Sequence, residues 1–475
     1  MSGSLNSITN TAASGLSAIK AGIAVISDNV ANAGVAGYTA KTLDLSTFDV
    51  SGQSFGVRTG NVSRSVDAAL QASTWASAST VSGLTVQSQV LQAVNQTQGT
   101  PGAGTSLADT LSALQTSFTE LQAQPSSPSQ QSTVVQAAAT LANTINGTAN
   151  TITSERNSVQ GQIVTAVASL NAALATVQST THSIMSAIAS NGSTANLLDQ
   201  RDAALQTLSS TLNLHYDQQS NGNITILGQN GLSIPLDSTF STASAVLSPA
   251  STYTPGGTSV PPILLQSSNP ADPPVDVTGQ LNGGQLGALI QLRDTTLPGY
   301  TASLDTFSAN LATQFSAQGL QLFTGAAGAS ITGSSVGLSS QIQVNPAVTA
   351  TPSLVRDGTT GTANPTGVAG FTGVIDNVLN GTFAGSGSTP SLGTQAQAFI
   401  TQQSADTAQA GTDLTNAKAY QTTVGSALSN GSGVNVDQQM GLMIQLQNSY
   451  QANAQVITTT STLFNALLAI FAQSV

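Results

Sequence analysis

The feature that most constrains this 475-residue chain is a pair of apolar stripes with helical spacing, one near each end of the sequence. In the first stripe, apolar side chains recur every three or four residues and so fall on one face of a helix. Its members are Leu5, Ile8, Ala12, Leu16, Ile19, Ile23, Ile26 and Val30. Gly34 and Gly37 follow, and glycine commonly stands just beyond the end of a helix. We therefore expect one amphipathic helix that ends near Gly34.

The second stripe is more regular, because its spacings of three and four alternate without a break. It consists of Met440, Met443, Gln447, Tyr450, Ala454, Ile457, Ser461, Phe464, Leu468 and Phe471. This is the a/d pattern of a coiled coil with two polar interruptions. A helix packed on the core of its own domain gives the same pattern. Two stripes of similar length at opposite ends nevertheless favour pairing between the ends.

From this pairing we predict an assembly interface that uses one face of each terminal helix. The first helix would supply Leu5, Ile8, Ile19, Ile23, Ile26 and Val30. The last helix would supply Met443, Tyr450, Ile457, Phe464, Leu468 and Phe471. Isolated amphipathic helices are marginal in water, so such stripes need a partner that buries them.

The middle of the chain predicts alternating helical and β-rich segments. The spacing of Ala, Leu, Val and Gln indicates helices over about residues 82–123, 130–190, 197–211, 286–318 and 394–428. Gly147 and Gly161 weaken the second of these, which allows a kink or a split, and Pro298-Gly299 predicts a break in the fourth. Asn221-Gly222 lies between two short apolar runs and predicts a β-hairpin.

These segments predict a mainly helical α+β fold with paired, coiled-coil-like terminal helices. We expect a terminal helical assembly domain, a helical rod domain and two insertions. The assembly domain would contain 1–45 with 434–475, and the rod domain 60–211 with 281–321 and 394–433. The insertion over 212–280 would be β-rich, and the one over 322–393 β-rich or irregular.

Charged residues are scarce and mostly acidic. Nine Lys and Arg stand against twenty Asp and Glu, which gives a net charge of −11, and the basic residues are scattered. Binding to nucleic acid or to an anionic membrane depends on clustered Lys and Arg, so both partner classes are disfavoured. No stretch approaches 18 uninterrupted apolar residues, so we expect no membrane span. The first residues do not resemble a conventional signal peptide.

Residues suited to catalysis are few. The chain has no cysteine and only two histidines, His182 and His215, whose spacing fits no metal motif. The segment Gly333–Gly337 matches the G-x-S-x-G pattern of a nucleophile elbow. Both histidines precede it, however, and the hydrolase order places the histidine after the serine. We interpret this segment as a loop in a tract rich in Gly and Ser.

One carboxylate pair invites two interpretations. Asp199 and Asp202 stand three residues apart and would share a helix face, as a pair for acid–base chemistry would. The alternative, which we favour, is that they form ion pairs with Arg201 or Arg293. We therefore predict no catalytic, cofactor-binding or metal-binding residues and no enzymatic activity.

A motif directly after the first helix carries a family resemblance. Ser27-Asp-Asn-Val-Ala-Asn32 leads into Ala31-Asn-Ala-Gly-Val-Ala-Gly-Tyr-Thr39. This closely resembles the helix end S-N-N-I-A-N and the signature A-N-x-x-x-x-G-Y-[TS]-R of the flagellar rod, hook and hook-associated proteins. The matching positions are Ala31, Asn32, Gly37, Tyr38 and Thr39. Ala40 replaces the usual arginine of the signature, and Lys41 follows it.

Segments near the other end narrow the resemblance to the hook-associated proteins of the hook–filament junction. Gly433-Val-Asn-Val-Asp437 and Leu442–Ala454 resemble the C-terminal signature of those proteins, with Gln438 and Gln439 in place of an acidic pair. Asn196–Asp202 and Gly283–Gly287, followed by Arg293–Pro298, resemble internal segments. The resemblance covers both ends and the helical middle, and it fades over about 213–280 and 322–393.

The resemblance implies a structural subunit of the bacterial flagellum that lies outside the cell after type III export without a cleaved signal. It implies no cofactor. The implied partners are other copies of the chain in a ring, the hook protein, hook-associated protein 3 and an export chaperone on the C-terminal segment. A hook or distal rod protein shares the N-terminal motif and remains an alternative. A secreted hydrolase and an adhesin are more distant alternatives.

Overall fold

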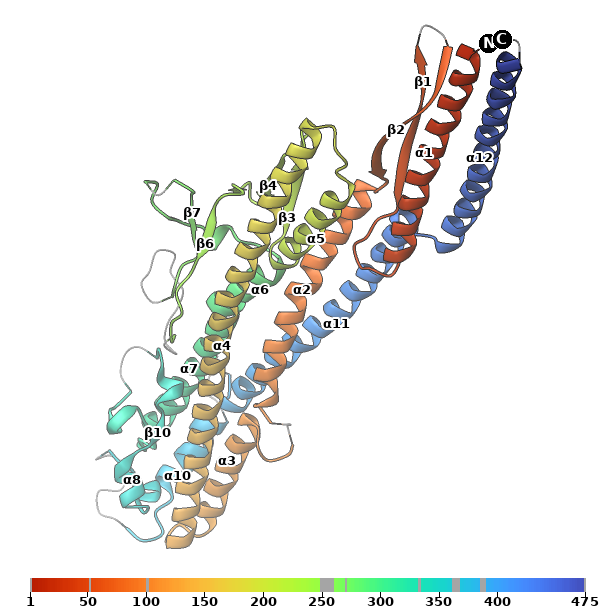
Figure 1. Ribbon diagram of the computed structural model, residues 1–475. Coiled ribbons are helices and arrows are strands. Elements are labelled where there is room, and N and C mark those ends of the chain that lie inside the picture. The colour runs from red at the N-terminus through yellow and green to blue at the C-terminus, as the bar shows by residue number, and fades with distance from the viewer. Residues whose placement is uncertain are drawn as a thin grey trace. The chain divides into compact units, whose positions relative to one another are not determined.

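The computed structural model describes residues 2–50, 53–99, 102–247, 260–269, 271–331, 335–360, 368–384 and 390–473 (Figure 1). The fold is mainly helical α+β, as the sequence predicts. The chain forms two compact units, which are described separately. Unit 1 consists of Met1–Ser79, Leu170–Ser238 and Lys418–Val475, and unit 2 of Thr80–Ser169 and Thr239–Ala417. Three long helices contribute residues to both units: α2 (Ala68–Gln96), α4 (Pro128–Ala189) and α11 (Leu392–Ser432).

In unit 1 the two terminal helices pack against each other, and a long β-hairpin packs on α1 beside them. Figure 1 shows α1 between the hairpin and α12. The remaining elements of the unit are α5 and a three-stranded antiparallel sheet in the order β3-β4-β5. The bounds are α1 (Ser2–Asn32), β1 (Lys41–Val50), β2 (Gln53–Arg64), α5 (Ala195–Thr211), β3 (Leu214–Gln218), β4 (Ile224–Gly228), β5 (Ser233–Ile234) and α12 (Val436–Gln473).

The predicted hairpin around Asn221-Gly222 is present as β3 and β4. Gly222 has a φ of +88°, a conformation that glycine adopts without strain. The ring of Tyr216 on β3 meets Trp75 of α2 edge to face, with centroids 5.0 Å apart. Tyr216 is half-buried, and its hydroxyl donates to the backbone carbonyl of Leu205. Burial raises the pKa of Tyr216 well above its ordinary value. Both half-buried aromatic residues therefore pack against each other within unit 1.

Unit 2 is built around helices α3, α4 and α7. Phe315 of α7 lies at the centre of an aromatic cluster, with ring centroids 5.8 Å from Phe118, 5.5 Å from Phe323 and 5.7 Å from Phe383. Small sheets of order β6-β7-β8 and β9-β10 flank the helices. The bounds are α3 (Leu107–Ala123), β6 (Thr239–Ser241), β7 (Leu264–Gln266), β8 (Val275–Asp276), α6 (Gly284–Gln291), α7 (Leu297–Ala317), β9 (Phe323–Thr324), β10 (Gln343–Val344), α8 (Pro346–Ala350), α9 (Leu354–Asp357) and α10 (Gly373–Asn377).

Helix α4 is long and apolar enough to cross a membrane by length and hydropathy alone. Within unit 2, however, its side chains Leu141, Ile145 and Ile152 have no exposed surface. A core helix of a globular domain meets the same criteria. The guanidinium of Arg156 also lies buried on this helix, where its Nε donates to the carbonyl oxygen of Arg293 (2.8 Å). These contacts identify α4 as a core helix. It runs without a split through Gly147 and Gly161, at which an added Cβ would meet only open space.

Two breaks differ from the prediction. The helix expected over 82–123 is interrupted, since α2 ends at Gln96 and α3 begins at Leu107. Gly99, Gly102 and Gly104 between them all have positive φ values, which a helix cannot contain. The break expected at Pro298 is instead a π-helical turn over Leu292–Thr296, directly before it. Proline lacks an N–H and is tolerated in the first turn of a helix, so α7 starts there.

Asp109 should make the start of α3 sensitive to acid. Its carboxylate accepts backbone N–H groups from Gly102, Gly104 and Ser106, and these bonds, that of Gly102 foremost, lower its pKa below the ordinary value. A lowered folded-state pKa stabilises the fold above pH ~4, and this stabilisation is lost as the pH falls through the folded value. We expect Asp109→Ala to lower the free energy of unfolding of unit 2 at pH 7 by less than about 1 kcal/mol, because solvent screens its carboxylate. Urea denaturation at pH 7 and pH 3 measures it; an equal loss at both values would contradict this role.

Candidate functional site

The contact between α1 and α12 follows one heptad position on each helix. Gly15 lies opposite Asn453, and Gly22 lies opposite Leu446. One heptad further along, Asn29 of α1 donates from Nδ2 to Oε1 of Gln439 on α12 (3.0 Å). Positions rise by seven on one helix while they fall by seven on the other, so the pair is antiparallel. A Cβ atom at position 22 would lie 3.0 Å from Leu446 Cδ1, so glycine at this position allows the close approach.

The structure places the predicted stripe of α1 as follows. Ile19 and Ile26 are buried, with 9% and 7% of their surface exposed. Ile23 and Val30 are half-buried, and Ile8 is exposed. The side chain of Leu5 lies outside the described residues. The contact positions Gly15, Gly22 and Asn29 stand one residue before Leu16, Ile23 and Val30, which the pattern selected because they are apolar.

On α12 the residues that face α1 also stand one position before members of the predicted stripe. Met443, Tyr450 and Ile457 are half-buried, whereas Phe464 is 37% and Leu468 52% exposed. The side chain of Phe471 lies outside the described residues. The row of α12 that faces α1 also contains residues that the predicted stripe does not include: Gln439, Leu446, Asn453 and Thr460. Three of these four residues are polar, so an apolar pattern does not reveal the row.

Asn29 is the central polar residue of this contact. Its side chain is fully buried and satisfied by hydrogen bonds. Besides the bond to Gln439, its Nδ2 donates to the carbonyl oxygen of Lys41, and its Oδ1 accepts from the Lys41 N–H and the Tyr38 hydroxyl. One amide therefore joins α1, the motif, the start of β1 and α12. Sequence reasoning missed this role, although Asn29 belongs to the helix-end part of the motif.

The motif itself forms the turn between α1 and β1. Asn32 closes the helix by donating from Nδ2 to the carbonyl of Asp28 (2.8 Å), and Ala31 beside it is exposed. Gly37 has a φ of +81°, which lets the chain reverse direction. Thr39 Oγ1 then donates to Asp199 Oδ1 of α5 (2.7 Å). The Lys41 ammonium sits 3.3 Å from the centre of the Tyr38 ring, a cation–π contact.

Two carboxylates of α5 anchor this turn and the hairpin. Asp199 accepts Lys41 Nζ at 2.9 Å and Arg64 Nη1 at 2.8 Å, and Asp202 accepts Arg64 Nη2 at 2.7 Å. The Gln71 amide also donates to Asp202 (2.6 Å). The side chains of the four charged residues are only 5–13% exposed. Lys41 on β1 is paired with Arg64 on β2 at the base of the hairpin. The ion pairs of these two residues with Asp199 and Asp202, here called the anchor, therefore hold the base of the hairpin on α5.

The expected partners of these carboxylates were wrong. Arg201 points into the core of unit 1, where Nη1 donates to the carbonyl of Gly222 (2.8 Å). Burial lowers the pKa of Arg201, partly offset by the nearby charge of Asp202. Arg293 belongs to unit 2 and pairs with Asp294 at 2.7 Å. Sequence spacing favoured the adjacent arginine, but a side chain one position from Asp202 on a helix points to another face.

The other candidate for catalysis, the segment Gly333–Gly337, leads into a loop that is bound to α7. Of the G-x-S-x-G segment, Gly333 and Ser334 lie outside the described residues, and Ser335–Gly337 form a loop. The N–H groups of Gly337 and Ser339 donate to the buried carboxylate of Asp305 on α7 (2.7 and 2.8 Å). Among the described residues no group of three His, Asp or Glu side chains is placed to hold a metal ion.

Comparison with known families gives three matches along the chain. The model described as "Flagellar hook-associated protein FlgK helical domain" matches residues 91–331, just over half of the sequence. The model "Flagella basal body rod protein" matches residues 10–39, which contain most of α1 and the motif. The model "Flagellar basal body rod FlgEFG protein C-terminal" matches residues 426–470, which contain most of α12.

Individual relatives agree with these matches. The chain is 26% identical over 322 residues to flagellar hook-associated protein 1 of Salmonella typhimurium, which covers 66% of this chain and 56% of that protein. The match to the Escherichia coli protein of the same name covers 66% and 57%. Among solved structures, the flagellar hook junction protein FlgK from Burkholderia pseudomallei gives a TM-score of 0.45 at 24% identity, over 55% of this chain and 45% of that one. The chain thus spans a little over half of the length of the curated relatives it matches.

Proposed function

This chain belongs to the flagellar hook-associated protein FlgK family, and from that membership we propose that it is a structural subunit of the bacterial flagellum at the junction between hook and filament. The family model for the helical domain supports this, together with rod-protein models that match the two terminal helices. The observation that carries the proposal is the paired assembly end of unit 1. It consists of α1, α12 and the β1–β2 hairpin, held at its base by the anchor.

The assembly end leaves much apolar surface in water. Exposed side chains on it include Ile8, Leu45, Phe48, Phe55, Leu442, Ile444, Leu463, Phe464 and Leu468. So many exposed large apolar side chains on one end of a unit indicate a protein interface. Burial of one such side chain contributes roughly 1.5–3 kcal/mol, so several together support stable association. We propose that neighbouring subunits of a polymer cover this surface.

The proposed partners follow from this placement. They are further copies of the chain in a ring, the hook protein on one side and hook-associated protein 3 on the other. We also propose that an export chaperone holds the C-terminal segment before type III export, since α12 would expose its apolar face to the cytoplasm when unpaired. The finished subunit would lie outside the cell, as part of the flagellum.

The rod-protein models at both ends favour one alternative, a hook or distal rod protein. Deletion of the gene separates the two functions. A junction subunit predicts cells with complete but bare hooks and with unpolymerised flagellin in the medium, as seen by electron microscopy and immunoblotting. Cells that lack hooks altogether would support the alternative. Normal filaments in the deletion strain would contradict both.

We further propose that the chain has no hydrolytic activity. Asp199 and Asp202 are occupied by Lys41 and Arg64, so neither carboxylate is free to act as an acid or a base. The purified protein should not turn over peptidoglycan, glycans or esters above the buffer rate. Turnover that disappears in Ser335→Ala or Asp202→Asn would contradict this expectation.

A further inference from the structure

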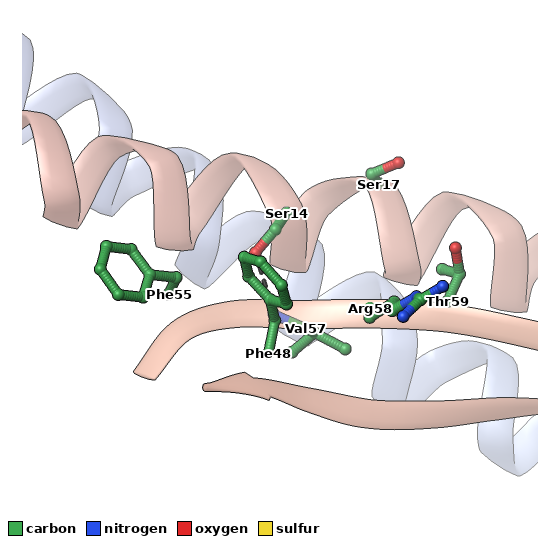
Figure 2. A pocket seen from close by; sticks show the side chains of 7 residues that line it. All are labelled: Ser14, Ser17, Phe48, Phe55, Val57, Arg58 and Thr59. Atoms are coloured by element: carbon green, nitrogen blue, oxygen red, sulfur yellow. Dashed lines mark hydrogen bonds between the residues drawn. The ribbon is translucent and has the colours of Figure 1, made fainter. Parts of the chain in front are cut away.

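The segment Gly283–Gly287 carries part of the family resemblance but lies outside the assembly end. The assembly end belongs to unit 1 and includes the groove between α1 and the β1–β2 hairpin that Figure 2 shows. Gly283–Gly287 belongs to unit 2, where it forms the start of α6. Asn282 directly precedes it and is exposed. The proposed function therefore assigns no role to this segment.

Glycine is needed in this segment because the main chain packs closely around the start of α6. A Cβ atom at Gly287 would lie 2.9 Å from the carbonyl carbon of Asn282 and 3.1 Å from its Cα atom. A Cβ atom at Gly83 of α2 would lie 2.8 Å from the carbonyl oxygen of Gly284. The main chain at residues 282–284 therefore has no room for an additional atom.

The dipeptide Asn282-Gly283 has a sequence that is prone to deamidation. In this reaction the main-chain nitrogen that follows an asparagine attacks Cγ of the asparagine side chain. Glycine hinders the attack least, because it has no side chain and a flexible backbone. The chain contains seven Asn-Gly dipeptides, which begin at Asn146, Asn191, Asn221, Asn230, Asn282, Asn380 and Asn430. The attacking nitrogen must be free, so the structure decides which of them react.

Six of these dipeptides are held by the backbone around them. Three lie in helical turns, namely those that begin at Asn146, Asn380 and Asn430. In three others the glycine N–H donates to a carbonyl oxygen: Gly192 to Ala187 at 2.7 Å, Gly222 to Gln219 at 3.0 Å and Gly231 to Gly228 at 3.0 Å. Asn282-Gly283 differs, because no hydrogen bond within the described residues engages the Gly283 N–H or the Asn282 side chain.

We propose that Asn282 is a site of spontaneous deamidation and that its isoaspartate product loosens the start of α6. The Gly283 nitrogen gives up its proton and forms a bond to Cγ of Asn282, and the side-chain nitrogen leaves as ammonia. Water then opens the resulting succinimide ring at one of its two carbonyl groups, which gives aspartate or isoaspartate. Water is the only co-reactant, and no group is oxidised or reduced.

The electrostatic surroundings of Gly283 support this reaction. Gly283 is the N-cap residue of α6, whose first turn has neither a side-chain cap nor an acidic residue. The N–H groups of such a turn form the positive end of the helix dipole, which stabilises negative charge. Negative charge develops on the Gly283 nitrogen as it loses its proton, and it remains on the carboxylate of the product.

The isoaspartate product should disturb α6 because its main chain is longer. The chain then passes through Cβ and Cγ of residue 282, which adds one methylene group to the backbone. The close approach of this backbone to Gly287 leaves no space for that group. Leu286 and Leu289, whose side chains have no exposed surface, follow in the same helix. Their amide hydrogens should therefore exchange faster in the isoaspartate form.

Incubation of the full-length protein at pH 8 in water labelled with oxygen-18 follows the reaction, because each product retains one solvent oxygen. Mass spectrometry of peptides then measures each dipeptide separately. Asn230 is the matched control, since it is also exposed and the φ of Gly231, +78°, is close to the +71° of Gly283. We expect Asn282 to react at least about tenfold faster than Asn230, because the hydrogen bond of Gly231 must first break. In concentrated urea the two rates should become similar.

Asn282→Gln keeps an exposed amide but forms the larger ring slowly, so it should abolish labelling at this position. After the same incubation the wild-type protein, but not this variant, should lose hydrogen-exchange protection at Leu286 and Leu289. Equal rates for Asn282 and Asn230 in the folded protein would overturn the proposed site. A difference that persists in urea would also overturn it, since local sequence alone would then be the cause. Labelling of Asn282 with unchanged exchange would overturn the effect on α6.

Discussion

Ile26→Asp is expected to separate α1 from α12 and to leave cells without filaments, while unit 2 keeps its fold. Ile26 is 7% exposed and lies between the contact positions Gly22 and Asn29. A carboxylate at this position would be desolvated without a partner, at a cost of several kcal/mol. Hydrogen exchange measured by mass spectrometry should show loss of protection in α1 and α12, with unchanged protection in α3 and α7.

The partner helix offers a graded comparison for this result. Ile457 is half-buried, so Ile457→Asp should also weaken the contact between α1 and α12. Phe464 is 37% exposed, so Phe464→Asp should keep the fold of the monomer and impair only assembly. Asn448→Asp lies on the exposed face of α12 and serves as the control that assembles normally. If Ile26→Asp cells grew normal filaments, or if the variant unfolded unit 2, the terminal pair would not be an independent assembly element.

The terminal helices were predictable because their stability depends on a repeated apolar period. The 3-4 spacing located α1 and α12 to within a few residues and indicated that they pair. It did not locate the contact row, because Gly15 and Gly22 carry no apolar side chain and Gln439 is polar. Close helix approach requires small residues, and periodicity analysis gives these no weight.

The anchor was only half predictable. Spacing placed Asp199 and Asp202 on one helix face and indicated ion pairs. Their partners Lys41 and Arg64 lie more than a hundred residues earlier, and the base of a hairpin brings them together. Local sequence contains no information on such a long-range register. The turn residue Tyr38 was identified only because it belongs to the family motif, and not from the local sequence pattern.

The irregular parts of unit 2 show a further limit. The segment over 322–393 has little regular pattern, and the structure contains short helices and a two-stranded sheet there. These elements depend on tertiary contacts such as the bonds from Gly337 and Ser339 to Asp305. Local propensity is too weak to predict elements of four or five residues.

Asp199→Ala is expected to be the most destabilising single change in unit 1 away from its apolar core. It removes the shared acceptor of Lys41, Arg64 and Thr39, leaves the poorly exposed Lys41 ammonium without a carboxylate partner and leaves Arg64 with Asp202 alone. Removal of one partner from a buried ion pair costs about 3–5 kcal/mol. The single tryptophan, Trp75, lies in unit 1, so its fluorescence during urea denaturation reports the unfolding of this unit.

A double-mutant cycle tests whether the loss arises from the anchor. Lys41→Met removes the second charge and keeps most of the unbranched side chain, so in Asp199→Ala it should restore part of the stability, with a coupling of about 1–3 kcal/mol. Asp44→Ala, which loses only an exposed hydrogen bond from Ser63, is the matched control and should change the unfolding free energy by less than about 0.5 kcal/mol. Additive losses in the cycle would show that Asp199 and Lys41 act independently. The turn would then depend on the hydrogen bonds of Asn29 with Lys41 and Tyr38 more than on the ion pair.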